Sequence, residues 1–289
     1  MANLKISFFT SCGNRLEHLK RTLPENIESN MSYDNCDHVV LDYGSTDDMI
    51  EWVKANLQDH LDTERLKLYS YPAKFFWHNH AKNLAAKCTD DSSDIICSID
   101  ADNFTGESKE GENLAEYLNS IFSKEEGDIF VRACGWDHEK DLWGNQEFKR
   151  KGDYYSASGK MAFRRKDFFK MRGFNEFMRG HYYDEEELWR RAMECWEFKR
   201  VQLPEEFSKF INHSNYLRLN NLDPDIIDSD KLLEKENIQF ALETVMDDTA
   251  KEVYPQAEKN KEILTYILGD KIRVPNPKYW AKGKPERIL

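Results

Sequence analysis

The sequence predicts an α/β protein with a mostly parallel, mixed sheet flanked by helices, followed by a helical C-terminal extension. Three observations carry this prediction. Short apolar runs alternate with amphipathic segments up to about residue 135. The amphipathic segments are long enough to cross over between parallel strands. Polar residues follow several of the apolar runs, at the strand ends where parallel sheets place their ligands.

Five apolar segments are predicted as strands. Each is short and rich in Ile, Val, Leu, Phe or Tyr, as buried strands are. In chain order they cover residues 4–10, 38–45, 65–71, 95–99 and 128–134.

The segments that follow these strands have apolar residues at helical spacing. Helices are expected over residues 15–29, 46–61, 77–89, 111–124 and 184–196. Thr46 is the expected N-cap of the second helix. Pro24 either interrupts or ends the first. The last helix opens with four acids, which suit its dipole, so capping alone would explain them.

Composition limits the class of protein. The chain has 289 residues, a formal charge of −12, 33% charged residues and 13% aromatic residues. A soluble globular protein is expected, and the negative charge argues against nucleic acid as a partner. Six scattered cysteines without a CxxC pair favour a reducing, cytoplasmic location. The N-terminal apolar run is too short for a signal peptide, and no stretch approaches the length of a transmembrane segment.

Asp100 and Asp102 stand directly after the predicted strand at residues 95–99. Side chains two apart on a strand point the same way, so these carboxylates repel each other unless something compensates them. A divalent metal would do so. A solvated acidic turn, which Asp and Asn favour at strand ends, is the alternative. The residues alone leave both interpretations open.

Five segments match, in order, the motifs of one enzyme class. They are FFTSCGNRLEHL, VVLDYGSTD, FFWHNHAKNLAAK, SIDADNF with its DxD motif, and RGFNEFMRGHYYDEEELWRR. Together they resemble the GT-A fold nucleotide-sugar glycosyltransferases, family 2 in particular, and in part the β-1,4-galactosyltransferase branch. The resemblance covers residues 4–216. It implies a GT-A domain with a Rossmann-like nucleotide-binding sheet at 1–216, and a helical extension with a basic tail at 217–289.

Two positions depart from the family pattern. Tyr43 stands where a second Asp is usual, and the usual Glu-Asp pair is Asp184-Glu185 here. By the resemblance, Glu185 would take the proton of the acceptor hydroxyl, with Asp184 as the second candidate. A base that acts directly on the acceptor implies single displacement and inversion at the anomeric carbon.

The resemblance also implies a metal site. Asp102 would ligate the metal, and Asp100 would contact the ribose and the metal. His213, in the segment FINHSNY, matches a metal ligand of the galactosyltransferase branch; an ordinary surface histidine is the alternative. Carboxylate ligands suit Mn²⁺ or Mg²⁺, and an imidazole ligand would favour Mn²⁺.

Nucleotide-binding residues follow from the same motifs. Asp42 would accept a hydrogen bond from the base, while Thr10 and Ser11 would line the base and ribose. Arg15 and Lys82 would approach the base or the diphosphate, although both could be simply solvated. UDP is the favoured nucleotide because the galactosyltransferase-like features belong to users of UDP-sugars.

The polar, aromatic loop at residues 135–160 would contact the donor or acceptor sugar. Trp136, Ser158 and Gly159 are its candidate residues, although core packing would equally explain the aromatic side chains of the loop. The acceptor is expected to be a glycan or glycoconjugate. Residues 217–289 would cap the acceptor site, form a homodimer contact, or bring the basic tail to an anionic membrane surface. A solvated tail is the simpler explanation.

Two other functions remain open from the sequence. A nucleotidyltransferase also combines such a sheet with metal-binding acids, but TSCGNR is a poor version of its Gly-rich phosphate loop. A nucleotide-sugar-binding module without turnover is the nonenzymatic alternative. The intact DxD motif and the acidic helix start argue against it.

Overall fold

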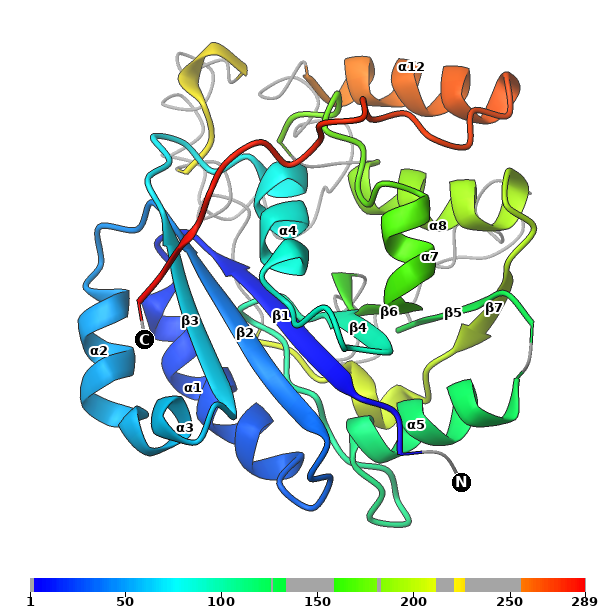
Figure 1. The fold of residues 1–289 in the computed structure, drawn as a ribbon. Helices are drawn as coiled ribbons and strands as arrows, with labels where there is room; N and C mark the ends of the chain where they lie inside the picture. Colours follow the sequence, from blue (N-terminus) through cyan, green and yellow to red (C-terminus); the bar gives the residue numbers. More distant parts are fainter. Residues whose placement is uncertain are drawn as a thin grey trace, which may run out of the picture.

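The protein is built on one sheet of eight strands (Figure 1). The computed structural model describes residues 3–125, 127–133, 159–180, 183–211, 221–226 and 256–288. The strand order is β7-β5-β6-β4-β1-β2-β3-β8. The strands are β1 (Ile6–Cys12), β2 (Cys36–Tyr43), β3 (Leu66–Tyr71), β4 (Ile95–Ser98), β5 (Ile129–Arg132), β6 (Met161–Arg164), β7 (Lys199–Gln202) and β8 (Glu286–Arg287).

Strands β1 to β4 run parallel to one another, whereas β6 and β8 join them antiparallel. The expected mostly parallel, mixed sheet is therefore confirmed. The carboxyl ends of β1 to β4 lie along one edge, which we call the carboxyl edge. Because β6 runs in the opposite direction to β4, with Met161 opposite Ser98, it begins at this edge. Gly159 thereby comes close to the acids that follow β4.

Helices cover both faces of the sheet (Figure 1). They are α1 (Leu16–Ser29), α2 (Met49–Asn56), α3 (Gln58–Asp62), α4 (His78–Lys87), α5 (Leu114–Lys124), α7 (Arg165–Lys170), α8 (Asp184–Glu194) and α12 (Gln256–Gly269), with short 3₁₀ turns η3 (Glu205–Ser208) and η4 (Pro224–Ile226).

Alternation along the strands divides the core between these helices. Phe9 packs in the apolar cluster that contains residues of α4, α7 and α8. Its neighbour Phe8 packs on the other face, in the cluster that contains α5. A third cluster joins the sheet to α1 and α2, through residues such as Leu19 and Val53. Helices α4 and α8, which carry candidate site residues, therefore cover the same face.

The predicted strands and helices are present, with differences in their ends and one division: the single helix expected over residues 46–61 is two helices, α2 and α3. Pro24 lies inside α1 and does not end it. Thr46 is not an N-cap: α2 begins after Asp48, which is left-handed with φ 55°. Thr46 instead donates its amide hydrogen to Asn14 Oδ1 at 2.7 Å, which ties the loop after β2 to the loop after β1. Strand β7 was not predicted because its sequence, KRVQ, is polar and lies at the sheet edge.

The C-terminal segment 276–288, which we call the strap, crosses α4 and ends as β8 beside β3 (Figure 1). Trp280 is buried in the cluster with α4. His80 Nε2 donates to the carbonyl oxygen of Lys282 at 2.8 Å, and Arg287 pairs with Glu64 at 2.6 Å. Contact of the basic tail with a membrane stays a prediction. Among the described residues, no helix has the length and apolar character needed to span a bilayer.

Candidate active site

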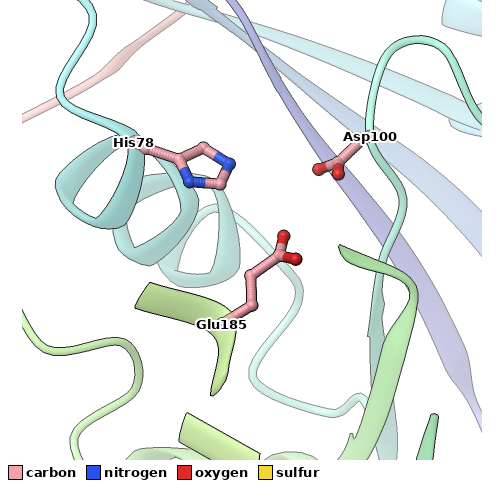
Figure 2. A group of neighbouring side chains, drawn as sticks. All are labelled: His78, Asp100 and Glu185. Atoms are coloured by element: carbon pink, nitrogen blue, oxygen red, sulfur yellow. The ribbon is translucent and has the colours of Figure 1, made fainter. Parts of the chain in front are cut away.

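Three elements bring charged side chains together at the carboxyl edge. Asp100 follows β4, His78 and Lys82 lie on α4, and Glu185 lies in the first turn of α8. Figure 2 shows that the His78, Asp100 and Glu185 side chains point toward one another. These three elements pack on the same part of the sheet, so residues about 100 positions apart become neighbours.

Lys82 is the centre of this charged cluster. Its Nζ lies 2.9 Å from Asp100 Oδ1 and 2.5 Å from Glu185 Oε1, and the residue is 2% exposed. Burial lowers the pKa of Lys82, but the carboxylates of Asp100 and Glu185 outweigh burial, so the pKa is raised overall. Lys82 is therefore not a solvated lysine, and its ammonium compensates part of the charge that follows β4.

Asp100 and Asp102 have different environments. Burial raises the pKa of Asp100, although Lys82 opposes that shift. Asp102 is half-buried, and its Oδ1 accepts a hydrogen bond from Asn103 Nδ2 at 2.7 Å. Its carbonyl oxygen accepts from the Ile211 amide at 2.7 Å. His213, two residues beyond Ile211, lies outside the described residues.

His78 and Asp184 form a buried pair beside the charged cluster. His78 Nδ1 bonds to Asp184 Oδ2. Since an ionised carboxylate only accepts, the imidazole donates through Nδ1. Asp184 is thus engaged with α4 and its side chain is 7% exposed, against 16% for Glu185. The sequence analysis did not single out His78; its place at the first position of α4, directly after an aromatic run, was the available signal.

Among the described residues, His78, Asp100 and Glu185 form a group of side chains that could hold a cation. One ligand atom from each lies within 4.8 Å of the others. Imidazole with carboxylates suits Mn²⁺. Lys82 shares these carboxylates, so an ion at this group would compete with the ammonium.

Gly159 makes room for the cluster. A Cβ atom at this position would lie 2.0 Å from Asp100 Oδ2 and 2.7 Å from Glu185 Oε1. Any side chain here would push the carboxylates aside. Trp136 and Ser158, predicted for the same loop, lie outside the described residues.

Four of the predicted nucleotide-binding residues lie at or just after the ends of β1 and β2. Thr10 Oγ1 donates to the Ile99 carbonyl oxygen at 2.8 Å, which commits its hydrogen to the start of the DxD segment. Asp42 is buried and accepts from the Ser45 amide at 2.9 Å and from Ser70 Oγ at 3.3 Å. These bonds shape the loop after β2. Ser11 pairs with Leu41 in the sheet.

Arg15 directly precedes α1, and its carbonyl oxygen accepts the Leu19 amide at 3.0 Å. Thr10, Ser11, Arg15 and Asp42 are therefore gathered at the carboxyl edge by β1 and β2. The charged cluster around Lys82 is gathered by β4, α4 and α8. Roles in nucleotide binding stay predictions for all of these residues.

Two solved structures share this architecture with the chain. One is mannosyltransferase PcManGT from Pyrobaculum calidifontis, solved with GDP-Man and Mn²⁺: the TM-score is 0.55 at 15% identity, over 92% of this chain and 72% of that one. The other is TarS from S. aureus, at TM-score 0.52 and 13% identity, over 93% of this chain and 85% of that one. No family model and no curated protein matches the chain. The chain has the GT-A glycosyltransferase fold, in agreement with the resemblance found in its motifs.

Proposed function

We propose that the protein is a metal-dependent, inverting glycosyltransferase. It would move a sugar from a nucleoside-diphosphate donor, with UDP favoured, to a hydroxyl of a glycan or glycoconjugate. The observation that carries this proposal is the Glu185 carboxylate, held 2.5 Å from Lys82 and beside Asp100 at the carboxyl edge. A carboxylate fixed at that edge is the group that single displacement by a hydroxyl needs.

Glu185 is the proposed general base. It would take the proton of the acceptor hydroxyl as the hydroxyl oxygen attacks the anomeric carbon and the bond to the diphosphate breaks. Attack from the face opposite the diphosphate inverts that carbon. Asp184, the second candidate from the sequence, is bonded to His78. That bond supports a positioning role for Asp184, at the helix turn that carries Glu185.

Lys82 and Gly159 support the base in different ways. Lys82 orients Glu185 and Asp100 together through its two ion pairs. Gly159 leaves the space beside both carboxylates free of a side chain. With Trp136 and Ser158, Gly159 belongs to the proposed donor and acceptor loop.

Asp102 and Asp100 are the proposed metal ligands, with His213 as a third. Their carboxylates fit Mn²⁺ or Mg²⁺, and a cation would offset the burial that raises the pKa of Asp100. When bound, the metal would neutralise charge on the leaving diphosphate. We assign Thr10, Ser11, Arg15, Asp42 and Lys82 to the nucleotide; a cytoplasmic location and a homodimer contact are also proposed.

Calorimetric titration with UDP, GDP and dTDP tests this function, each with Mn²⁺ and with EDTA. We expect one nucleotide, UDP first, to bind only with Mn²⁺, and Asp102→Ala to lose that binding. Asp94→Ala is the matched control, because Asp94 lies at the opposite end of β4. Binding that ignores both Mn²⁺ and Asp102 would refute metal dependence, and binding of none of the three would refute the transferase proposal.

A further inference from the structure

A pocket of about 280 Å³ lies between the loop after β3 and the segments around residues 180 and 223. Its wall is aromatic and includes Tyr71, Phe75 and Trp77. Arg179 and Asp223 supply its charged groups, with the Arg179 guanidinium 5.8 Å from the centroid of the Trp77 ring, and Lys74 is exposed. None of the residues proposed for the metal or nucleotide lines it.

The walls of this pocket are tied together. Trp77 Nε1 donates to the Met178 carbonyl oxygen at 3.3 Å, which joins the loop after β3 to the segment before α8. The Phe76 amide donates to the Asn221 carbonyl oxygen at 2.7 Å, which joins the same loop to the segment of Asp223. The pocket is therefore formed by the fold itself, and its shape can select a ligand.

The lining chemistry selects a neutral sugar ring. Arg179 and Asp223 are paired at 2.5 Å, so their charges balance while both keep hydrogen-bonding atoms at the pocket. Aromatic rings beside a paired Arg and Asp suit a pyranose, which has an apolar face for the rings and hydroxyls at its edge for the hydrogen-bonding groups. The volume lies just below the usual range for sites that take drug-sized molecules. One sugar ring fits this volume better than a chain of rings.

The position of the pocket relates it to the charged cluster. Trp77 directly precedes His78, and Gly180, which also lines the pocket, lies four residues before Asp184. The rings of Phe76 and His78 are 6.0 Å apart between centroids. Trp77 thus adjoins the start of α4, and Gly180 lies shortly before the start of α8 in the sequence.

We propose that this pocket binds the terminal sugar ring of the acceptor, so that the protein extends the end of a glycan and does not branch it internally. This inference rests on the proposed function. A ring seated against Phe75 and Trp77 would present a hydroxyl along the start of α4 toward Glu185. The nucleotide would occupy the ends of β1 and β2, next to the Tyr43 side of this pocket.

Ligand-observed NMR tests the inference without any transfer reaction. Methyl glycosides of glucose, galactose, mannose, xylose and N-acetylglucosamine are offered to the wild-type protein, and saturation transfer to their ring protons is recorded. At least one glycoside is expected to bind, and Phe75→Ala is expected to weaken it at least fivefold. Phe177→Ala is the matched control, because Phe177 is 61% exposed and does not line the pocket.

A second variant, Asp223→Asn, keeps the pocket volume and removes one charge of the Arg179 pair; it is expected to weaken the same glycoside. UDP with Mn²⁺ is titrated into each variant. Unchanged nucleotide affinity with lost glycoside binding supports the proposal. Binding of no glycoside to the wild type, or loss of UDP binding in Phe75→Ala, overturns it. Failure of wild-type UDP binding would instead count against the proposed function.

Discussion

Two buried lysines near the candidate active site have opposite electrostatic environments. Lys82 contacts the carboxylates of Asp100 and Glu185, and its pKa is raised despite burial. The Lys160 ammonium donates to the carbonyl oxygens of Phe104 and Phe207, and burial lowers its pKa to about 8. Both side chains are fully enclosed. Burial alone therefore does not set the direction in which the pKa of a lysine shifts. Charged partners raise the pKa of Lys82, whereas Lys160 has only carbonyl oxygens as partners and its pKa falls.

The comparison also separates two uses of a buried ammonium. Lys82 joins charged groups from β4 and α8, so it organises the candidate chemistry. Lys160 joins backbone carbonyls of the segment after the DxD motif and of η3, so it organises loops. Gly159, directly before Lys160 in the sequence, adjoins the first of these sites. Four predictions test this division, from the largest expected effect to the smallest.

Glu185→Gln tests whether the charged cluster around Lys82 is catalytic. The amide keeps the shape of the side chain but accepts no proton, so kcat for transfer should fall by about 10² to 10⁴-fold. Affinity for UDP with Mn²⁺ should stay unchanged. Glu186→Gln is the control, because Glu186 pairs with Arg190 at 3.3 Å, outside the cluster. Full activity of Glu185→Gln would exclude it as the base.

Lys82→Met and Lys160→Met compare the two lysines directly. Removal of Lys82 leaves two carboxylates without their ammonium, and should lower the free energy of unfolding by about 3–5 kcal/mol. Removal of Lys160 leaves only two carbonyl oxygens without a donor, which should cost about 1–3 kcal/mol. Urea denaturation at pH 7 measures both. Equal losses, or a larger loss for Lys160→Met, would contradict the comparison.

Gly159→Ala tests whether the charged cluster around Lys82 needs the open space beside Asp100 and Glu185. The added Cβ would collide with Asp100 Oδ2 at 2.0 Å, so the carboxylates must move. Crowding of this kind should lower the free energy of unfolding by about 1–3 kcal/mol and weaken Mn²⁺-dependent nucleotide binding. Gly127→Ala serves as the comparison, because its Cβ would meet no described atom within 4 Å. Wild-type stability and nucleotide affinity in Gly159→Ala would show that the space is not needed.

The pH dependence of stability tests the lowered pKa of the buried Lys160. Its folded pKa of about 8 lies below the ordinary value of 10.5. Between these values the unfolded chain holds a proton that the folded protein has lost, so stability rises with pH; below pH 8 both states hold it. From pH 8 to 9.5, wild type should gain about 1–2 kcal/mol relative to Lys160→Met. A constant difference between the two proteins over this range would contradict the prediction.

Much of the fold could be predicted because its signals are local. Alternating apolar and amphipathic segments indicated the parallel strands and the helices between them, and the DxD pair indicated the carboxyl edge. Strand β7 was not predicted, because an edge strand tolerates polar residues such as Lys199 and Arg200. The pairing of the strap with the sheet was not predicted, because the two residues of β8 are too few to show a periodic pattern.

The candidate site was predicted in part, for a related reason. The four acids that open α8 look equivalent in the sequence. In the structure the first two face His78 and Lys82, from α4, and the next two pair with Arg190 and Arg191 on α8 itself. Helical spacing predicts the last two pairs, whereas nothing local predicts the first two.

The sequence by itself determined the class of fold, and it predicted the edge of the sheet for ligand binding and the acids that stand there. These follow from the periodicity of neighbouring residues and from strand direction. Only the tertiary structure decided which acids share an ammonium, that Lys82 is buried, and that Gly159 must have no side chain. The physical reason is distance along the chain: Lys82 and Glu185 are 103 residues apart, so their ion pair and the burial that shifts the pKa of Lys82 exist only once the sheet has brought α4 and α8 together.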